Sequence, residues 1–458
     1  MRSIWAVAIN TLRQALRMKI AVVFTLLLLI FLPAFGYTVS GDGTLTGKLQ
    51  TFISYGLSLV SLLLCLLTIV ASVYTLSNDL TEKQIFTVLT KPLRRYQLLL
   101  GKLFGILMLD FILMIVFGAI IYIIAVSMPK FSESTEFEKF VADNAFFTAR
   151  ASLKPKEPDV TKEVKALFER RRKNGQLPQA VLENPEAQRN YLKRLTKQVK
   201  LSKRSVPTGG AILWQFEKVK PLSEDDKLFI RFKYDVSRNP HDLQVTGQWF
   251  VGDNRQYGRD IKTHYENIER RDVIRTPQEI AVSADVIAED GYLAVAFRND
   301  PRANDTVVIF PPVDGLEVLY KADSFTANFI KALIMIYLRL VFLSCLGILS
   351  ATFLSFPIAI LLCLLVFSTG SISGFIIESF DFIGETMGNI YSYTVKPLIQ
   401  MLPQFDKVNP NTYLVPARLL SWSFLSSVFA IMVCIKSVII MIFALIIFSF
   451  REVGRVIV

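Results

Sequence analysis

The hydrophobic pattern places apolar runs toward both ends of the chain, with a long polar block, 128–325, between them. An apolar run of about 18 residues or more is long enough to cross a hydrocarbon core of about 30 Å. Six runs meet this requirement, at Lys19 to Tyr37, Phe52 to Leu76, Leu103 to Ser127, Phe329 to Leu354, Pro357 to Ile377 and Leu419 to Phe450. We therefore expect a polytopic α-helical membrane protein with six transmembrane helices.

The polar block changes its hydrophobic period near Pro207. Residues 128–206 have helical periodicity and many basic residues, which predicts a helical region organised as a hairpin. In 207–325, short runs of alternating apolar and polar residues are separated by turn signals, which is typical of a β-sandwich. The insertion is thus an α+β domain. Its aromatic residues form either the sandwich core or a platform for a glycan; they are Trp214, Tyr234, Trp249, Tyr257 and Tyr265.

The segment before the first span is amphipathic. Ser3 to Lys19 places apolar residues at helical spacing and arginines off that stripe, which is typical of a helix lying in the membrane interface. The alternative is an N-terminal extension of the first span. We assign 1–127 to this helix and the first three spans, and 326–458 to the last three.

The charge distribution predicts the orientation. The chain carries a formal net charge of +12, yet the polar block holds 33 basic and 30 acidic residues, so the excess lies beside the membrane segments. Lys and Arg are enriched in cytoplasmic loops. This rule places both termini in the cytoplasm and 128–325 outside. The position of the excess charge beside the membrane segments argues against nucleic acid as a partner.

No catalytic motif is present in the sequence. There is no G-x-x-x-x-G-K-[ST] to hold nucleotide phosphates, no G-x-S-x-G and no H-E-x-x-H. The two histidines, His241 and His264, lack metal-ligand spacing, and all four cysteines lie in apolar spans. We expect no enzymatic activity, no cofactor and no metal in this chain.

The loop between the second and third spans has a pattern of its own. Asp79 and Glu82 have the spacing of a helix cap, and Pro92 ends the short helix that follows. Ile85, Val88 and Leu89 form one apolar stripe. This predicts a stiff amphipathic helix over 79–92, parallel to the membrane, which suits a docking lever.

At these residues the chain resembles permease subunits of ABC-2-type (type V) exporters, in particular the sodium-efflux and copper-enzyme-maturation branch. Four features carry the resemblance. They are Asn10-Thr11 with Arg13; Glu82 with Thr87, Leu89, Lys91-Pro92 and Arg95, followed by Leu100-Gly101-Lys102; the hairpin from Leu346 to Leu361; and LPQFDKVNP from Leu402 to Pro410. The polar block lies outside the resemblance, and Phe86 stands where the family usually has Gly.

The resemblance implies a dimer of six-helix halves, homo- or heteromeric, in which each half grips a separate ABC ATPase through the cytoplasmic helix. The coupling residues would be Glu82, Ile85, Thr87, Val88, Leu89, Lys91, Pro92 and Arg95. It also implies that 378–418 forms short re-entrant helices at the outer mouth; the alternative is an ordinary external loop.

Three ionisable residues fall inside predicted spans, namely Asp110, Arg339 and Lys436. Charges at such depth are costly and usually face a partner or a wet cavity. We expect Arg339 and Lys436 either to meet an acid such as Asp110 or to extend toward the interface, with a role in the translocation path as a further possibility.

Two functions follow as hypotheses. The first is a transmembrane permease subunit of an ABC exporter, surrounded by membrane lipid, that couples ATP hydrolysis by a partner chain to transport or mechanical work. The second is a membrane-anchored extracytoplasmic scaffold whose sandwich binds a glycan or a periplasmic partner protein.

Overall fold

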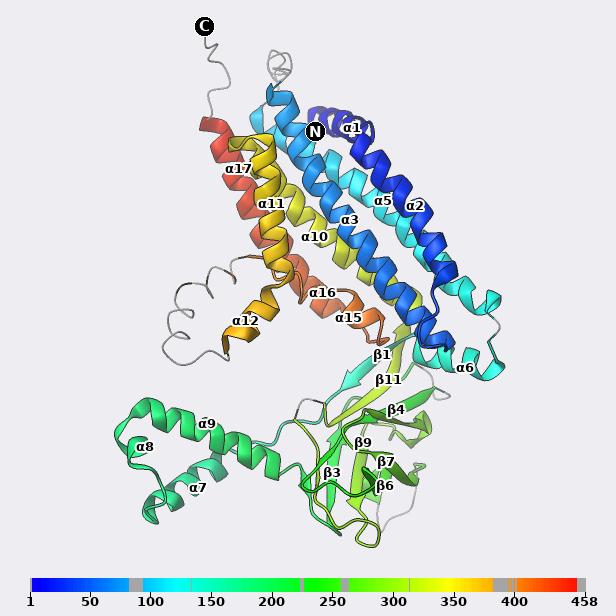
Figure 1. Ribbon diagram of the computed structural model, residues 1–458, viewed down its shortest axis with the longest axis vertical. Coiled ribbons are helices and arrows are strands. Elements are labelled where there is room, and N and C mark those ends of the chain that lie inside the picture. Colours follow the sequence, from blue (N-terminus) through cyan, green and yellow to red (C-terminus); the bar gives the residue numbers. More distant parts are fainter. Residues whose placement is uncertain are drawn as a thin grey trace. The chain divides into compact units, whose positions relative to one another are not determined.

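In the computed structural model the chain forms two compact units (Figure 1). The membrane unit comprises Met1–Ala149 and Ser324–Val458, and the polar unit comprises Arg150–Asp323. The structure describes residues 2–81, 94–132, 134–222, 226–256, 263–312, 314–381, 394, 397, 399 and 402–450.

Within these residues, five helices of the membrane unit are long and apolar enough to cross a bilayer. They confirm five of the six predicted spans. They are α2 (Lys19–Thr38), α3 (Leu45–Thr81), α5 (Arg95–Phe131), α10 (Phe325–Phe353) and a continuous helix made of α16 (Trp422–Phe429), the π-helical turns η3 (Ala430–Ser437) and α17 (Val438–Phe450).

The predicted span Pro357 to Ile377 is not confirmed. Helix α11 (Phe356–Ser371) has 16 residues, and α12 (Ser373–Asp381) begins after a break. At about 1.5 Å per residue, α11 is shorter than a hydrocarbon core of about 30 Å. The chain at 403–405 packs against this helix end. A Cβ atom at Gly370 would lie 2.5 Å from the carbonyl oxygen of Pro403, and the Gly370 carbonyl oxygen accepts from the backbone N–H of Phe405 at 2.9 Å.

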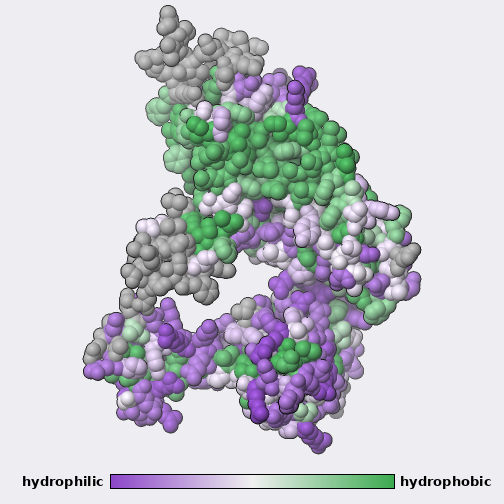
Figure 2. All heavy atoms as spheres, in the orientation of Figure 1, coloured by the Kyte–Doolittle hydropathy of each residue, from purple (hydrophilic) through white to green (hydrophobic). Residues whose placement is uncertain are grey.

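Many large apolar side chains of the membrane unit are exposed, and on the face that Figure 2 shows they form a broad hydrophobic belt. Helix α2 contributes many of them, including Ile30, which is 70% exposed. Monomeric soluble proteins rarely expose apolar patches of this extent, so this belt requires lipid or a partner. Helix α10, in contrast, is buried along most of its length and lies at the centre of the unit.

The N-terminal helix α1 (Arg2–Leu16) is separate from α2 and packs on α5 through small residues. A Cβ atom at Gly105 would lie 2.5 Å from the carbonyl oxygen of Ala8, and one at Gly101 would lie 2.6 Å from Cβ of Val7. Glycine at these positions therefore allows the two helices to touch. Two further short helices are α6 (Glu136–Ala145) and α15 (Asn411–Leu414).

The polar unit is built mainly from β-strands. One four-stranded sheet has the order β1-β11-β4-β8 and another has the order β3-β9-β6-β7, with a small sheet β2-β10-β5. The strands are β1 (Thr148–Leu153), β2 (Ser205–Val206), β3 (Ala211–Phe216), β4 (Lys227–Phe232), β5 (Asp235–Val236), β6 (Gln244–Gly252), β7 (Glu266–Val273), β8 (Gln278–Ser283), β9 (Leu293–Asn299), β10 (Val308–Ile309) and β11 (Leu316–Ser324).

The two larger sheets share one core. Phe232 on β4 and Trp249 on β6 have ring centroids 4.4 Å apart, and Trp249 also contacts Phe297 on β9. Trp214, Tyr234 and Trp249 are buried, which places them in this core, whereas Tyr265 is 38% exposed and Tyr257 lies outside the described residues. The region is therefore rich in β-sheet, as predicted.

The helical part of the block, 128–206, also contains two strands, the longer β1 and the two-residue β2 at its end. Thr148–Leu153 was expected to be helical and is the edge strand β1 instead, next to β11. The expected helices are present as α7 (Thr161–Lys173), α8 (Gln179–Glu183) and α9 (Pro185–Ser202). Val164, Phe168 and Leu195 form a small core between them.

Candidate functional site

The two helices that flank the predicted docking loop are tied by a buried ion pair. Nζ of Lys102 on α5 lies 2.6 Å from a carboxylate oxygen of Asp79 on α3, and these side chains are 2% and 16% exposed. Nζ of Lys102 also donates to the carbonyl oxygen of Thr75 at 2.6 Å. Removing one partner of a buried pair leaves an uncompensated charge and is strongly destabilising. The pair therefore holds both ends of the loop together.

Asp79 differs from its predicted role. It was expected to cap a new helix over 79–92, but it lies in the last turns of α3, which continues to Thr81. Most of the predicted coupling residues fall beyond this point and lie outside the described residues; they are Glu82, Ile85, Thr87, Val88, Leu89, Lys91 and Pro92.

Arg95, the last predicted coupling residue, is the first residue of α5. Its Nη1 donates to the carbonyl oxygen of Phe448 at 2.9 Å and also contacts that of Ser449, in the last turn of α17. Carbonyl groups in the last turn of a helix lack intrahelical donors. Arg95 therefore joins the start of α5 to the end of the last helix.

Arg339 lies inside the bundle and binds backbone carbonyl groups. Its Nη2 donates to the carbonyl oxygens of Phe405 at 3.0 Å and Val408 at 2.8 Å, and Nη1 donates to the Ser61 hydroxyl at 3.3 Å. The guanidinium also lies 5.3 Å from the centre of the Phe405 ring. Through this side chain, helix α10 binds the backbone of the segment 402–420 at two points.

Two further polar side chains from spanning helices hold the same segment. Lys436, in the π-helical turns, donates to the carbonyl oxygen of Leu402 at 2.8 Å. Asn328 on α10 donates to the carbonyl oxygen of Arg418 and accepts from the backbone N–H of Leu420, both at 2.8 Å. In hydrocarbon, irregular backbone is tolerated only where protein or water satisfies its polar groups. The side chains of Lys436 and Asn328 thus supply hydrogen-bond partners for backbone groups of Leu402, Arg418 and Leu420.

Residues of the segment reach back to the helices as well. Asn411 donates to the Ser54 carbonyl oxygen at 2.9 Å and to the Ser58 hydroxyl at 2.7 Å, both on α3. Ser373 donates to Asp406 at 2.6 Å. A cavity of about 320 Å³ remains beside Arg339, bordered by α3, α11 and the segment.

Asp110 has a different environment. The side chain is fully buried on α5, and its Oδ1 accepts from the Thr68 hydroxyl of α3 at 2.9 Å. In the described part of the chain, Arg339 and Lys436 bind backbone carbonyl oxygens and neither forms an ion pair with Asp110, so pairing with this acid, one of the two expected alternatives, is not observed. Asp110 connects α3 to α5, whereas the two cations hold the segment 402–420.

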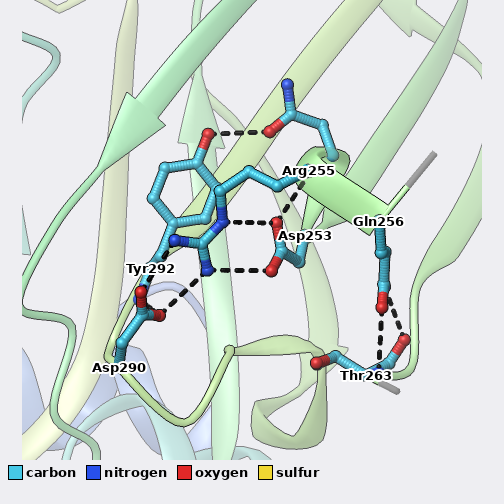
Figure 3. A network of polar contacts seen from close by, with 7 residues as sticks. Asp253, Arg255, Gln256, Thr263, Asp290 and Tyr292 are labelled. Atoms are coloured by element: carbon cyan, nitrogen blue, oxygen red, sulfur yellow. Dashed lines mark hydrogen bonds and ion pairs between the residues drawn. The ribbon is translucent and has the colours of Figure 1, made fainter. Parts of the chain in front are cut away.

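In the polar unit, the loops at one end of the sheets are joined by a network centred on Arg255 (Figure 3). Its guanidinium lies between Asp253 and Asp290, with hydrogen bonds of 2.7 to 3.0 Å, and 3.9 Å from the centre of the Tyr292 ring. The hydrogen bonds lower the pKa of both carboxyl groups below the ordinary Asp value and raise the pKa of Arg255.

This network borders an open groove of about 1520 Å³. All three charged groups satisfy one another, and their pKa shifts favour the charged forms that make the contacts. The arrangement is thus suited to fixing two loops together and offers no activated acid, base or nucleophile. Among the described residues, no group of three or more His, Cys, Asp or Glu side chains is placed to hold a metal ion.

Comparison with known proteins concerns the first third of the chain. No match is found among curated proteins or among solved structures. Residues 5–151, which include α1, α2, α3 and α5, match the model of the family described as ABC-2 family transporter protein.

Proposed function

We propose that this chain is the permease subunit of an ABC transporter and couples ATP hydrolysis by a separate ATPase chain to export or mechanical work. The observation that carries the proposal is the match to the ABC-2 family model over residues 5–151, a region that contains both helices of the predicted docking loop. The sequence has no phosphate-binding motif of its own, which is why we place the nucleotide site in a partner chain.

The contacts at the ends of the loop support this mechanism. A displacement of the loop by an ATPase has to reach the spanning helices to do work. Lys102 and Asp79 join α3 to α5 where the loop leaves them, and Arg95 joins α5 to the end of α17. A push on the loop would therefore move three spanning helices together rather than one.

We further propose a dimer of such chains in a bacterial inner membrane. The exposed apolar belt of the membrane unit supports this in part, because it offers area both for lipid and for a second copy. The rival function, a scaffold that binds glycan through an aromatic platform, loses support because Trp214, Tyr234 and Trp249 are in the core.

The decisive experiment acts on the predicted apolar stripe of the loop. Val88→Asp with Leu89→Asp places two charges where we expect contact with the ATPase. Truncating central apolar anchors of an interface typically costs about 1 to 4 kcal/mol, and a buried charge costs more. We expect ATPase pull-down and transport-coupled hydrolysis to be lost, while the thermal melt of the permease stays unchanged.

Two controls make the result specific. Val23→Asp with Leu27→Asp introduces the same charges on exposed positions of α2, and it should impair membrane insertion or stability without a selective loss of ATPase binding. If the loop variant keeps its ATPase and instead shows a lower melting temperature, Val88 and Leu89 pack on the permease itself and the docking role is wrong. Hydrolysis of ATP by the isolated chain would contradict the subunit assignment.

A further inference from the structure

The near balance of charge in the polar block hides two regions of opposite sign. The helical arm, which we define as residues 161–204, contains 13 Lys and Arg against four Asp and Glu. The β-rich remainder, residues 205–323, contains 15 Lys and Arg against 20 Asp and Glu. The positive charge is therefore concentrated on α7, α8 and α9.

The apolar face of the arm is already occupied. Phe168 and Tyr191 have ring centroids 6.1 Å apart, Arg171 donates to the Tyr191 hydroxyl at 2.8 Å, and Leu195 is buried with them. The inward face of α9 is thus used by α7. Of the large apolar side chains described in the arm, only Leu182 and Leu201 are exposed.

The outward face of α9 carries a cationic stripe. Arg189, Lys193 and Lys197 recur every four residues, so they line up on one side of the helix, and all three are exposed. Some basic residues of the arm are neutralised, for example Lys200 by Glu157 and Lys203 by Glu163. Within the described residues eight exposed ones have no acidic partner: Lys162, Lys165, Arg170, Lys173, Arg189, Lys193, Arg194 and Lys197.

We propose that the arm binds the anionic phospholipid headgroups of a membrane surface. Eight unneutralised cations call for a partner of high negative charge density. Stable protein interfaces need an apolar centre, which two exposed leucines do not supply. A single-stranded nucleic acid would need exposed aromatic side chains for stacking, and Tyr191 is used inside the arm.

An anionic lipid surface is also the polyanion that lies close to this chain. The chain is held in a bilayer by its spanning helices, so headgroups are present at high local concentration around it. Because the apolar face of α9 is occupied, the contact is electrostatic and lies at headgroup level without insertion. Such binding is reversible and weakens with salt. It does not depend on the ATPase partner.

The test uses the full chain in lipid nanodiscs, with Cys434→Ser to remove the one exposed cysteine. A fluorophore on Gln198→Cys, an exposed position of α9, reports contact through quenching by a headgroup spin label. We expect quenching in discs of phosphatidylcholine mixed with phosphatidylglycerol, and none in phosphatidylcholine alone or at high salt. Each cation near an anionic surface strengthens binding about fivefold, so Arg189→Gln, Lys193→Gln and Lys197→Gln together should weaken it by about a hundredfold.

The matched control removes three exposed cations from the β-rich part, Lys220→Gln, Arg298→Gln and Arg302→Gln, and should leave quenching unchanged. An equal loss in both triple variants, with equal thermal melts, would assign the effect to overall charge and overturn the proposal. Equal quenching in discs with and without phosphatidylglycerol would also overturn the proposal. So would an arm that binds soluble polyphosphate while showing no preference for phosphatidylglycerol.

Discussion

At the scale of single residues, the two cations inside the bundle, Arg339 and Lys436, bind backbone carbonyl groups and do not pair with Asp110. The sequence identifies Arg339, Lys436 and Asp110 as costly and therefore significant, but it does not show which backbone groups lack donors. Arg339 and Lys436 both bind carbonyl oxygens of one irregular segment. That segment lies 63 or more residues away from Arg339 in sequence, and no local pattern encodes the contact.

The first prediction concerns Arg339→Leu. The substitution removes the donors of the Phe405 and Val408 carbonyl groups, and leaving a buried polar group unpaired costs about 1 to 3 kcal/mol. We expect a free energy of unfolding lower by about 2 kcal/mol or more, measured as a thermal shift in detergent. Arg339→Lys keeps the charge but not the forked geometry, so an intermediate shift should result. An unchanged melt together with lost transport would instead place Arg339 on the translocation path.

At the scale of elements, the sequence predicts the helices and strands that have a strong hydrophobic period. It misses those that depend on contacts with residues far away in the sequence. Five apolar spans and strands β3, β4, β6, β9 and β10 follow their patterns. The edge strand β7 has alternate positions exposed and few apolar residues, so its pattern is weak. Strand β1 exists because it lies beside β11, more than 160 residues later. At the end of α11, the Gly370 carbonyl oxygen accepts from the backbone N–H of Phe405, a long-range contact that no local pattern shows.

The second prediction concerns the contact between α1 and α5. Replacing Gly by Ala in a helix normally stabilises it by about 1 kcal/mol. At Gly105 the added carbon would meet the Ala8 backbone at 2.5 Å, so α1 has to move, and overpacking costs about 1 to 3 kcal/mol. We expect Gly105→Ala to lower the melting temperature and to expose α1 to protease.

Gly56→Ala is the matched control. Its added carbon would find the Leu32 side chain at 3.7 Å, which is an ordinary contact, so α3 should keep or gain stability. Equal behaviour of the two variants would show that α1 does not depend on this close approach.

At the scale of the whole molecule, contacts within the membrane unit define its two ends. At one end, Gly101 of α5 meets Val7 of α1, and Arg95 binds the last turn of α17. Helix α1 and the end of α17 thus lie at the same end of the bundle, as Figure 1 also shows. At the other end, the Tyr122 hydroxyl lies 2.7 Å from that of Thr326, where the chain leaves α5 and re-enters α10.

This arrangement bears on the number of crossings. If the start and the end of the membrane unit lie on one side, the chain passes through the bilayer an even number of times. With five full spans, the sixth passage falls to α11 together with the irregular segment that Arg339 and Lys436 hold. In that topology a 16-residue helix followed by irregular backbone with bound polar groups would replace the uninterrupted span expected from hydropathy.

The third prediction tests this topology directly. In a Cys434→Ser background, Asn174→Cys at the exposed end of α7 should react with a membrane-impermeant maleimide added to intact cells. Asn10→Cys on the exposed side of α1 should react only after permeabilisation, because the basic residues around it favour the cytoplasm. Both substitutions lie on helix surfaces away from the cores, so folding is retained. Labelling of both positions from the same side of the membrane would contradict the orientation. A label placed after α17 then tests the sixth passage, because an even number of crossings requires that label to react on the same side as Asn10→Cys.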